Sequence, residues 1–143
     1  MTLSILSLQF ASCQEKFEQL PENKTDKTKI ELASKITNSY FENLKNGNHY
    51  DFKNEAIKEF KDKMTPDIQK QTYEQVRQKF GDFKSITYSG TWIKKDNKEF
   101  QIIRFKGDFE KSEEPLEIRV VLNGSNKISG LWITLWKDNL NNS

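Results

Sequence analysis

The sequence is poor in cysteine and histidine, since its 143 residues include only one of each. A single cysteine excludes a disulfide within the chain, and there is no Cys-x-x-Cys or His-x-x-x-His pair to bind a transition metal. The sequence also lacks a calcium loop, a glycine-rich phosphate loop and a Gly-x-Ser-x-Gly motif. We therefore predict no metal, no cofactor and no catalytic residues.

A charge imbalance and a long hydrophobic run are also missing. Lysine and arginine total 23 against 21 acidic residues, and the two signs are interspersed, so no nucleic-acid partner is predicted. No apolar run approaches the roughly 20 residues that span a bilayer. Aromatic residues are plentiful, with ten Phe, four Tyr and three Trp. Their large side chains can build the core of one domain, and a second domain would need roughly 100 residues more.

The N-terminal residues differ from the polar remainder. An apolar run from Leu3 to Ala11 has the length of a signal-peptide core. The following Phe-Ala-Ser-Cys, residues 10–13, resembles the lipobox of bacterial lipoproteins. The resemblance implies a signal peptide over residues 1–12, lipidation of Cys13, export, and a membrane anchor in the periplasm or at the outer membrane. The alternative is a cytosolic protein with an apolar N-terminal strand and a buried free thiol.

Three segments are predicted after the cysteine. Residues 13–24 are polar and contain a proline, which is typical of a flexible tether. Residues 25–138 carry regular hydrophobic periods and form the folded domain. Residues 139–143 are predicted to be a frayed, disordered tail.

The first half of the domain has the helical period. A capping box, Thr-Lys-Ile-Glu, starts a helix near Thr28, and Asn-Gly-Asn at 46–48 ends it. Asp51 is predicted to cap a second helix that extends to about Met64. Thr65 with the following proline starts a third helix, which ends at a glycine.

The second half alternates with period two. Four strands are predicted, over residues 83–93, 99–110, 115–122 and 127–137, joined in order by short turns. Helices followed by consecutive strands indicate the α+β class, with three N-terminal helices packed on a curved four-stranded antiparallel sheet.

This order of elements resembles the nuclear-transport-factor-2-like cone, in particular a bacterial domain family of unknown function. Two short motifs carry the resemblance, Gly-Asn-His-Tyr-Asp at 47–51 and Gly-Asp-Phe at 81–83. The wider fold includes isomerases, cyclases and binding modules, and its enzymes place a carboxylate or histidine as general base in an apolar cone. His49 is the only histidine. We interpret it as a capping or packing residue, and a catalytic pair with Asp51 is the alternative.

Four large rings are predicted to share strand parity with two glycines: Tyr88, Trp92, Trp132 and Trp136 with Gly90 and Gly130. Glycines beside rings permit a strongly curved sheet, and such a sheet over helices leaves a pocket at its open end. We predict that these rings line a ligand pocket, with Arg104 or Arg119 as the polar anchor. Two alternatives stay open: the rings fill the core, or the arginines pair across strands with Glu99 or Glu117.

Together these features predict a non-catalytic, lipid-anchored binding module of the cell envelope. Its partner would be a small molecule or a protein, in addition to the membrane. One alternative is a structural subunit that forms a homodimer through its sheet. The other is an isomerase or cyclase-type enzyme that uses the cone.

Overall fold

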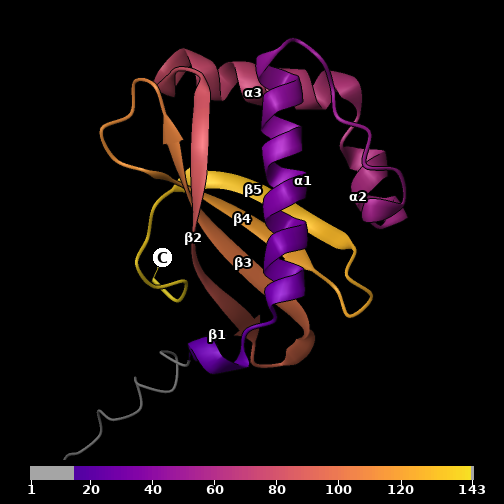
Figure 1. The fold of residues 1–143 in the computed structure, drawn as a ribbon, viewed down its shortest axis with the longest axis vertical. Coiled ribbons are helices and arrows are strands. Elements are labelled where there is room, and N and C mark those ends of the chain that lie inside the picture. Colours follow the sequence, from indigo (N-terminus) through magenta and orange to yellow (C-terminus); the bar gives the residue numbers. More distant parts are fainter. Residues whose placement is uncertain (1–14, 143) are drawn as a thin grey trace, which may run out of the picture.

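The computed structural model describes residues 15–142, which form one antiparallel sheet with helices on one face (Figure 1). The strands lie in the sheet in chain order, each paired with the next. They are β1 (Phe17–Gln19), β2 (Phe83–Lys94), β3 (Asn97–Phe109), β4 (Leu116–Leu122) and β5 (Ile128–Leu135). The α+β class is confirmed, and the meander makes β1 and β5 the two edges.

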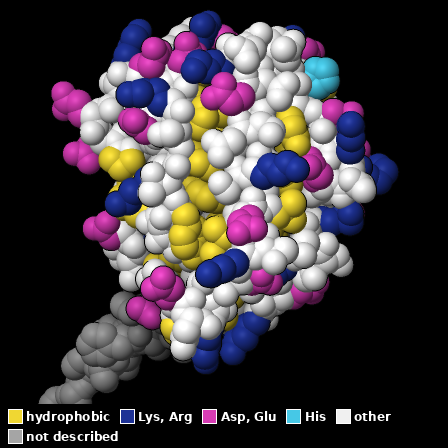
Figure 2. Space-filling view, viewed as in Figure 1, with side chains coloured by type: hydrophobic (Ala, Val, Ile, Leu, Met, Phe, Trp, Pro, Cys, Tyr) yellow, Lys and Arg dark blue, Asp and Glu magenta, His cyan; other side chains and the backbone are white. Residues whose placement is uncertain are grey.

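Three α-helices and two single 3-10 turns complete the fold. The helices are α1 (Lys27–Lys45), α2 (Lys58–Lys63) and α3 (Pro66–Phe80), and the 3-10 turns are Glu22–Lys24 and Lys53–Glu55. Figure 1 shows α1 lying in front of the sheet, with α3 across its upper end. In Figure 2, hydrophobic side chains gather in strips beside α1, and charges of both signs are scattered over the rest of this face.

The core lies between α1 and the sheet. Apolar side chains of α1 recur at spacings of three and four, which places Ile36, Tyr40 and Phe41 on one buried stripe. Phe41 stacks on Phe83 of β2 with ring centroids 4.8 Å apart. Alternate residues of β3 and β4 complete this core from the sheet: Ile103, Phe105, Phe109, Leu116, Ile118, Val120 and Leu122.

The first helix begins slightly earlier than predicted. Asp26 is its N-cap, and the Asp26 carboxylate accepts a hydrogen bond from the backbone N–H of Thr28 at 2.9 Å. The third helix is confirmed. Thr65 accepts from the Ile68 N–H at 3.3 Å, and Gly81 adopts φ 80° at the C-terminal end.

The predicted second helix is present, but its predicted length is wrong. Asp51 accepts from the backbone N–H of Lys53 at 3.0 Å, so it caps a 3-10 turn, and α2 is only six residues long. Between the turn and α2, Ala56 forms a β-bridge with Ile128, and the Ile57 N–H donates to the Ile128 carbonyl at 3.0 Å. This contact with β5 holds the chain extended where the local pattern favours a helix.

The sheet has five strands, so the prediction of four is also wrong. The additional strand, β1, lies in the segment predicted to be a tether and pairs with residues 92–94 of β2. Phe17 of β1 packs beside Trp92 and Ile102. A strand of three residues is too short to show an alternation of apolar and polar residues in the sequence. Its extended conformation depends on pairing with the edge of β2.

The C-terminal residues also differ from the expected frayed tail. Leu140 is buried against Trp92 and Ile102, and the Asn141 side chain is bonded to the backbone of Lys16 and Phe17. The contact joins segments 124 residues apart in the sequence, so no local pattern reveals it. The predicted signal peptide, residues 1–12, and Cys13 lie outside the described residues.

Candidate binding face

Most of the predicted ligand residues lie on the sheet face opposite the helices, here called the outer face. Trp92 pairs with Ile102 across β2 and β3, and Arg104 pairs with Arg119 across β3 and β4. Arg119 in turn pairs with Trp132 of β5. Because successive side chains of a strand alternate between faces, these residues point away from the helix-facing core.

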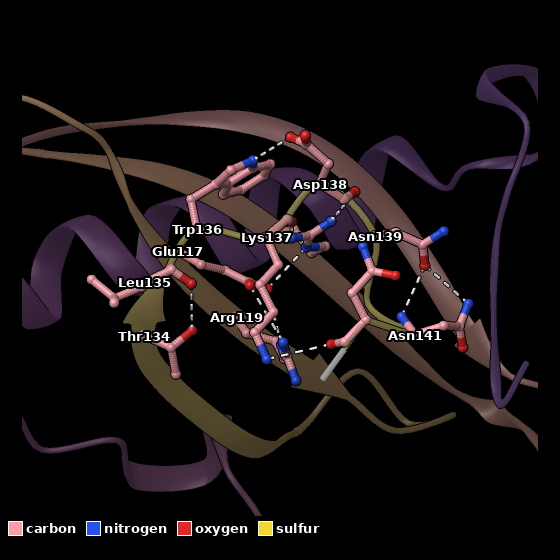
Figure 3. Close-up of polar contacts among 11 residues, drawn as sticks. Glu117, Arg119, Thr134, Leu135, Trp136, Lys137, Asp138, Asn139 and Asn141 are labelled. Atoms are coloured by element: carbon pink, nitrogen blue, oxygen red, sulfur yellow. Dashed lines mark hydrogen bonds and ion pairs between the residues drawn. The ribbon is translucent and has the colours of Figure 1, made fainter. Parts of the chain in front are cut away.

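Glu117 of β4 is the polar centre of this face (Figure 3). Its Oε2 accepts from Arg104 Nε at 2.9 Å and from Arg119 Nε at 3.0 Å, and its Oε1 accepts from Arg119 Nη2 at 3.3 Å. The side chains of Glu117 and Arg104 are 0% and 3% exposed. Burial acts to raise the pKa of Glu117, but the hydrogen bonds and charges of the two arginines outweigh it and lower that pKa.

The guanidinium of Arg104 is enclosed on all sides. It lies 5.6 Å from the centroid of Trp92 and 4.3 Å from that of Trp136. One N–H of Nη1 donates to the backbone carbonyl of Asp138, and one N–H of Nη2 donates to that of Lys137. All three nitrogens of the Arg104 guanidinium therefore make a hydrogen bond inside the protein. Both arginines pair with Glu117, which is one of the alternatives that the sequence left open.

Tyr88 does not share a face with the tryptophans. The pairing of β2 with β3 slips between Tyr88 and Gly90, where Gly90 adopts φ 150°. This β-bulge adds one residue, so Gly90 and Trp92 lie on the outer face while Tyr88 remains on the helix side, 6.3 Å from the ring of Phe105. The Tyr88 hydroxyl bonds to Thr91 Oγ1 at 2.7 Å.

Trp132 lies flat over Gly130, two residues earlier on β5. A Cβ atom at residue 130 would overlap with Trp132 Cη2, so this position of the indole requires glycine there. Trp132 nevertheless remains 50% exposed, and Leu135 is 68% exposed. Trp132 is in the middle of β5 on the outer face, and Leu135 is at the end of β5 on the opposite face, so each is a separate candidate contact point.

A hollow of about 530 Å³ adjoins Trp136. The C-terminal end of α3, the β3–β4 turn and the end of β5 surround it. Its apolar lining is Phe80, Pro115, Leu116, Leu135 and Trp136, and its polar lining is Lys79, Lys111, Ser112, Glu113 and Glu114. Of these residues, only Trp136 is a ligand-pocket residue predicted from the sequence. Adjacent apolar residues at a strand end, Leu135 and Trp136, were the available signal, because one of two neighbours must face away from the core.

His49 follows α1 in an exposed loop. It borders a smaller hollow of about 160 Å³ together with Tyr50, Phe52 and Gln69. Gln69 is buried and holds this loop by bonding to the backbone N–H and carbonyl of Tyr50, at 2.8 and 3.0 Å. No hydrogen bond joins His49 to Asp51 in the described structure, and the Asp51 carboxylate is bonded to the backbone of Lys53.

Two further properties apply to residues 15–142 alone. No helix in this range is long and apolar enough to cross a membrane. No group of three or more His, Cys, Asp or Glu side chains in this range is placed to hold a metal ion.

Comparison with known proteins assigns a family. A family described as a protein of unknown function (DUF3887) matches residues 37–131. The chain belongs to DUF3887. The DUF3887 match includes the Arg104, Glu117 and Arg119 cluster and ends at Leu131, before the exposed end of β5. No curated protein and no solved structure has significant similarity to the chain.

Proposed function

We propose that this DUF3887 protein is a non-catalytic binding module of the bacterial cell envelope, attached to a membrane through a lipid on Cys13. Its ligand is an apolar molecule with an acidic group, bound in the hollow beside Trp136. The observation that carries this proposal is the lining of the hollow, which combines five apolar residues with two lysines.

The charges around the hollow support an acidic ligand group. Arg104 and Arg119, the anchors favoured by the sequence, already neutralise Glu117. Lys79 and Lys111 make no ion pair with any described residue, so their ammonium groups are available to an incoming carboxylate. The acids Glu113 and Glu114 also line the hollow, and they would orient the acidic group towards the lysines.

The state of Glu117 supports binding rather than catalysis. A general base must exchange protons near the working pH. Glu117 is buried, and its two arginine partners lower its pKa, which favours a permanently charged structural role. We also propose that the fold is the nuclear-transport-factor-2-like cone, and helices on one face of a meander sheet support this assignment.

Tryptophan fluorescence tests the binding proposal. We expect decanoate, below its micellar concentration, to change the emission of the protein saturably, and Trp136→Phe to remove most of that change. The double variant Lys79→Gln/Lys111→Gln should weaken decanoate binding about tenfold. It should leave the binding of decanol, which has no charge, nearly unchanged.

Two comparisons make this test decisive. Lys98→Gln removes a lysine from the start of β3, away from the hollow, and should bind decanoate as the wild type does. If neither decanoate nor decanol gives a saturable response, the proposed ligand class is wrong. If Lys98→Gln, which removes one charge, costs about half the binding free energy that the double variant costs by removing two, the effect is one of net charge, and this would also contradict the site.

A further inference from the structure

The two edges of the sheet are built differently. β1 has three residues, includes Glu18, and is soon followed by Pro21. Short length, charge and proline are the features that keep an edge strand from pairing with another chain. The opposite edge, β5, has eight residues and none of these features.

Most of the β5 edge is unpaired within residues 15–142. One side of β5 pairs with β4. On the other side, Ala56 and Ile57 pair through their backbone only with Ile128, and α2 lies beside β5. No backbone hydrogen bond from another described segment reaches Ser129–Leu135. The N–H and C=O groups on this side are therefore open to a further strand.

The side chains of this segment carry no charge. Its sequence, Ser-Gly-Leu-Trp-Ile-Thr-Leu, is neutral, whereas β2, β3 and β4 all contain charged residues. Trp132 and Leu135 are both half exposed or more. The charges of a charged partner strand would find no opposite charge on this segment. A second copy of the same neutral strand would bring no charge that repels or stays unpaired.

We propose that two copies of this protein pair antiparallel through Ser129–Leu135 of β5, which joins their sheets into one. The ends of the free segment set the register. Ala56 and Ile57 block Ile128, and β5 ends at Leu135, so full overlap of the seven free residues places the two-fold axis at their midpoint, residue 132. Trp132 then lies opposite Trp132 of the second copy, and Leu131 lies opposite Ile133.

This register predicts a charge-swap result. We expect the full-length chain to sediment as a dimer of the 16.8-kDa polypeptide. Trp132→Glu and Trp132→Lys each place like charges directly opposite across the axis, so each variant alone should raise the dimer dissociation constant at least about tenfold. An equimolar mixture of the two variants should recover the dimer, because the new carboxylate of one copy then faces the new ammonium group of the other.

Ile68→Glu and Ile68→Lys are the matched controls. Ile68 is 43% exposed on α3, so its variants make the same charge changes on an apolar side chain away from β5, and they should remain dimeric. Circular dichroism of each variant reports whether it is folded, and the mixture keeps the test valid if one variant is less stable.

Three results would overturn the proposal. The wild type could remain monomeric at about 100 μM, a concentration at which a micromolar dimer is nearly complete. The Trp132 variants could dimerise as well as the wild type, which would assign the dimer to another surface. The variants could fail to recover the dimer when mixed, which would exclude the two-fold register.

Discussion

At the scale of single residues, Glu117 is the most constrained side chain of the outer face. It is fully buried, and both of its oxygens accept hydrogen bonds from arginine. Burial of a carboxylate is unfavourable on its own, and the two guanidinium groups offset that cost only while the carboxylate is charged. The stability of the outer face should therefore depend on this one charge.

Glu117→Gln should destabilise the protein by about 3 kcal/mol, since it leaves Arg104 buried without its counter-charge. Urea denaturation measures this change in the free energy of unfolding. Glu113→Gln, an exposed change of the same chemistry, should stay within about 0.5 kcal/mol of the wild type.

The pH dependence follows from the lowered pKa of Glu117. The unfolded chain binds this proton near pH 4.5, and the folded protein binds it only at lower pH. The contribution of Glu117 to stability is thus fully present above about pH 4.5 and is lost as the pH falls below it. The wild type should lose stability more steeply than Glu117→Gln over that acidic range, and parallel curves would contradict the role given to the charge.

At the scale of elements, the two ends of the described chain hold each other in place. Asn141 Oδ1 accepts from the backbone N–H groups of Lys16 and Phe17, both at 2.9 Å, and its Nδ2 donates to the Phe17 carbonyl at 3.1 Å. Leu140 is buried next to this contact. The C-terminal residues therefore act as a clasp that fixes the short strand β1 to the sheet.

Asn141→Ala should loosen β1 without unfolding the domain. Loss of three side-chain hydrogen bonds should speed amide hydrogen exchange at Lys16 and Phe17 about tenfold or more, since each bond contributes roughly 1 kcal/mol. Exchange in β3 and β4 should stay slow. Asn142→Ala removes a side chain with no such bonds in the structure, and it should leave exchange at these amides unchanged. If the two variants behave alike, the clasp is not what holds β1.

At the scale of the whole molecule, the order of strands separates the two proposed attachments. The segment that leads from Cys13 enters the fold at β1, one edge of the sheet, and the free strand β5 is the other edge. A membrane anchor at Cys13 and a second copy at β5 would therefore use opposite edges of the sheet. Neither attachment requires the other.

Cys13 is predicted to be the site of acylation. When the full gene is expressed in a bacterial host, the protein should fractionate with membranes, and its intact mass should show loss of residues 1–12 and gain of lipid. Cys13→Ser should abolish both changes. Ser12→Ala keeps a small residue before the cysteine and should behave as the wild type. A wild-type protein that stays soluble and retains Met1 would contradict the prediction.

Local physics explains how much of the fold could be predicted. The stripe of Ile36, Tyr40 and Phe41, and the alternation along β3 and β4, are properties of neighbouring residues, so the sequence reveals them directly. The same holds for the Thr65 cap of α3. For the candidate site, strand parity grouped Tyr88 with Trp92, and this was wrong because a one-residue bulge between them reverses the parity.

By itself the sequence determined the α+β class, the helix-facing core, and the pairing options of Arg104 and Arg119, because each depends on periodicity or on the need of a strand charge for a partner. Only the tertiary structure decided that Glu117 takes both arginines, that Asn141 holds β1, and that Phe80, Leu135 and Trp136 enclose one hollow. The physical reason is the same in each case. Apart from the Arg119–Glu117 pair, whose members are two residues apart on β4, these contacts join residues that are close in space and separated in the chain. The geometry of all of them exists only once the sheet has formed.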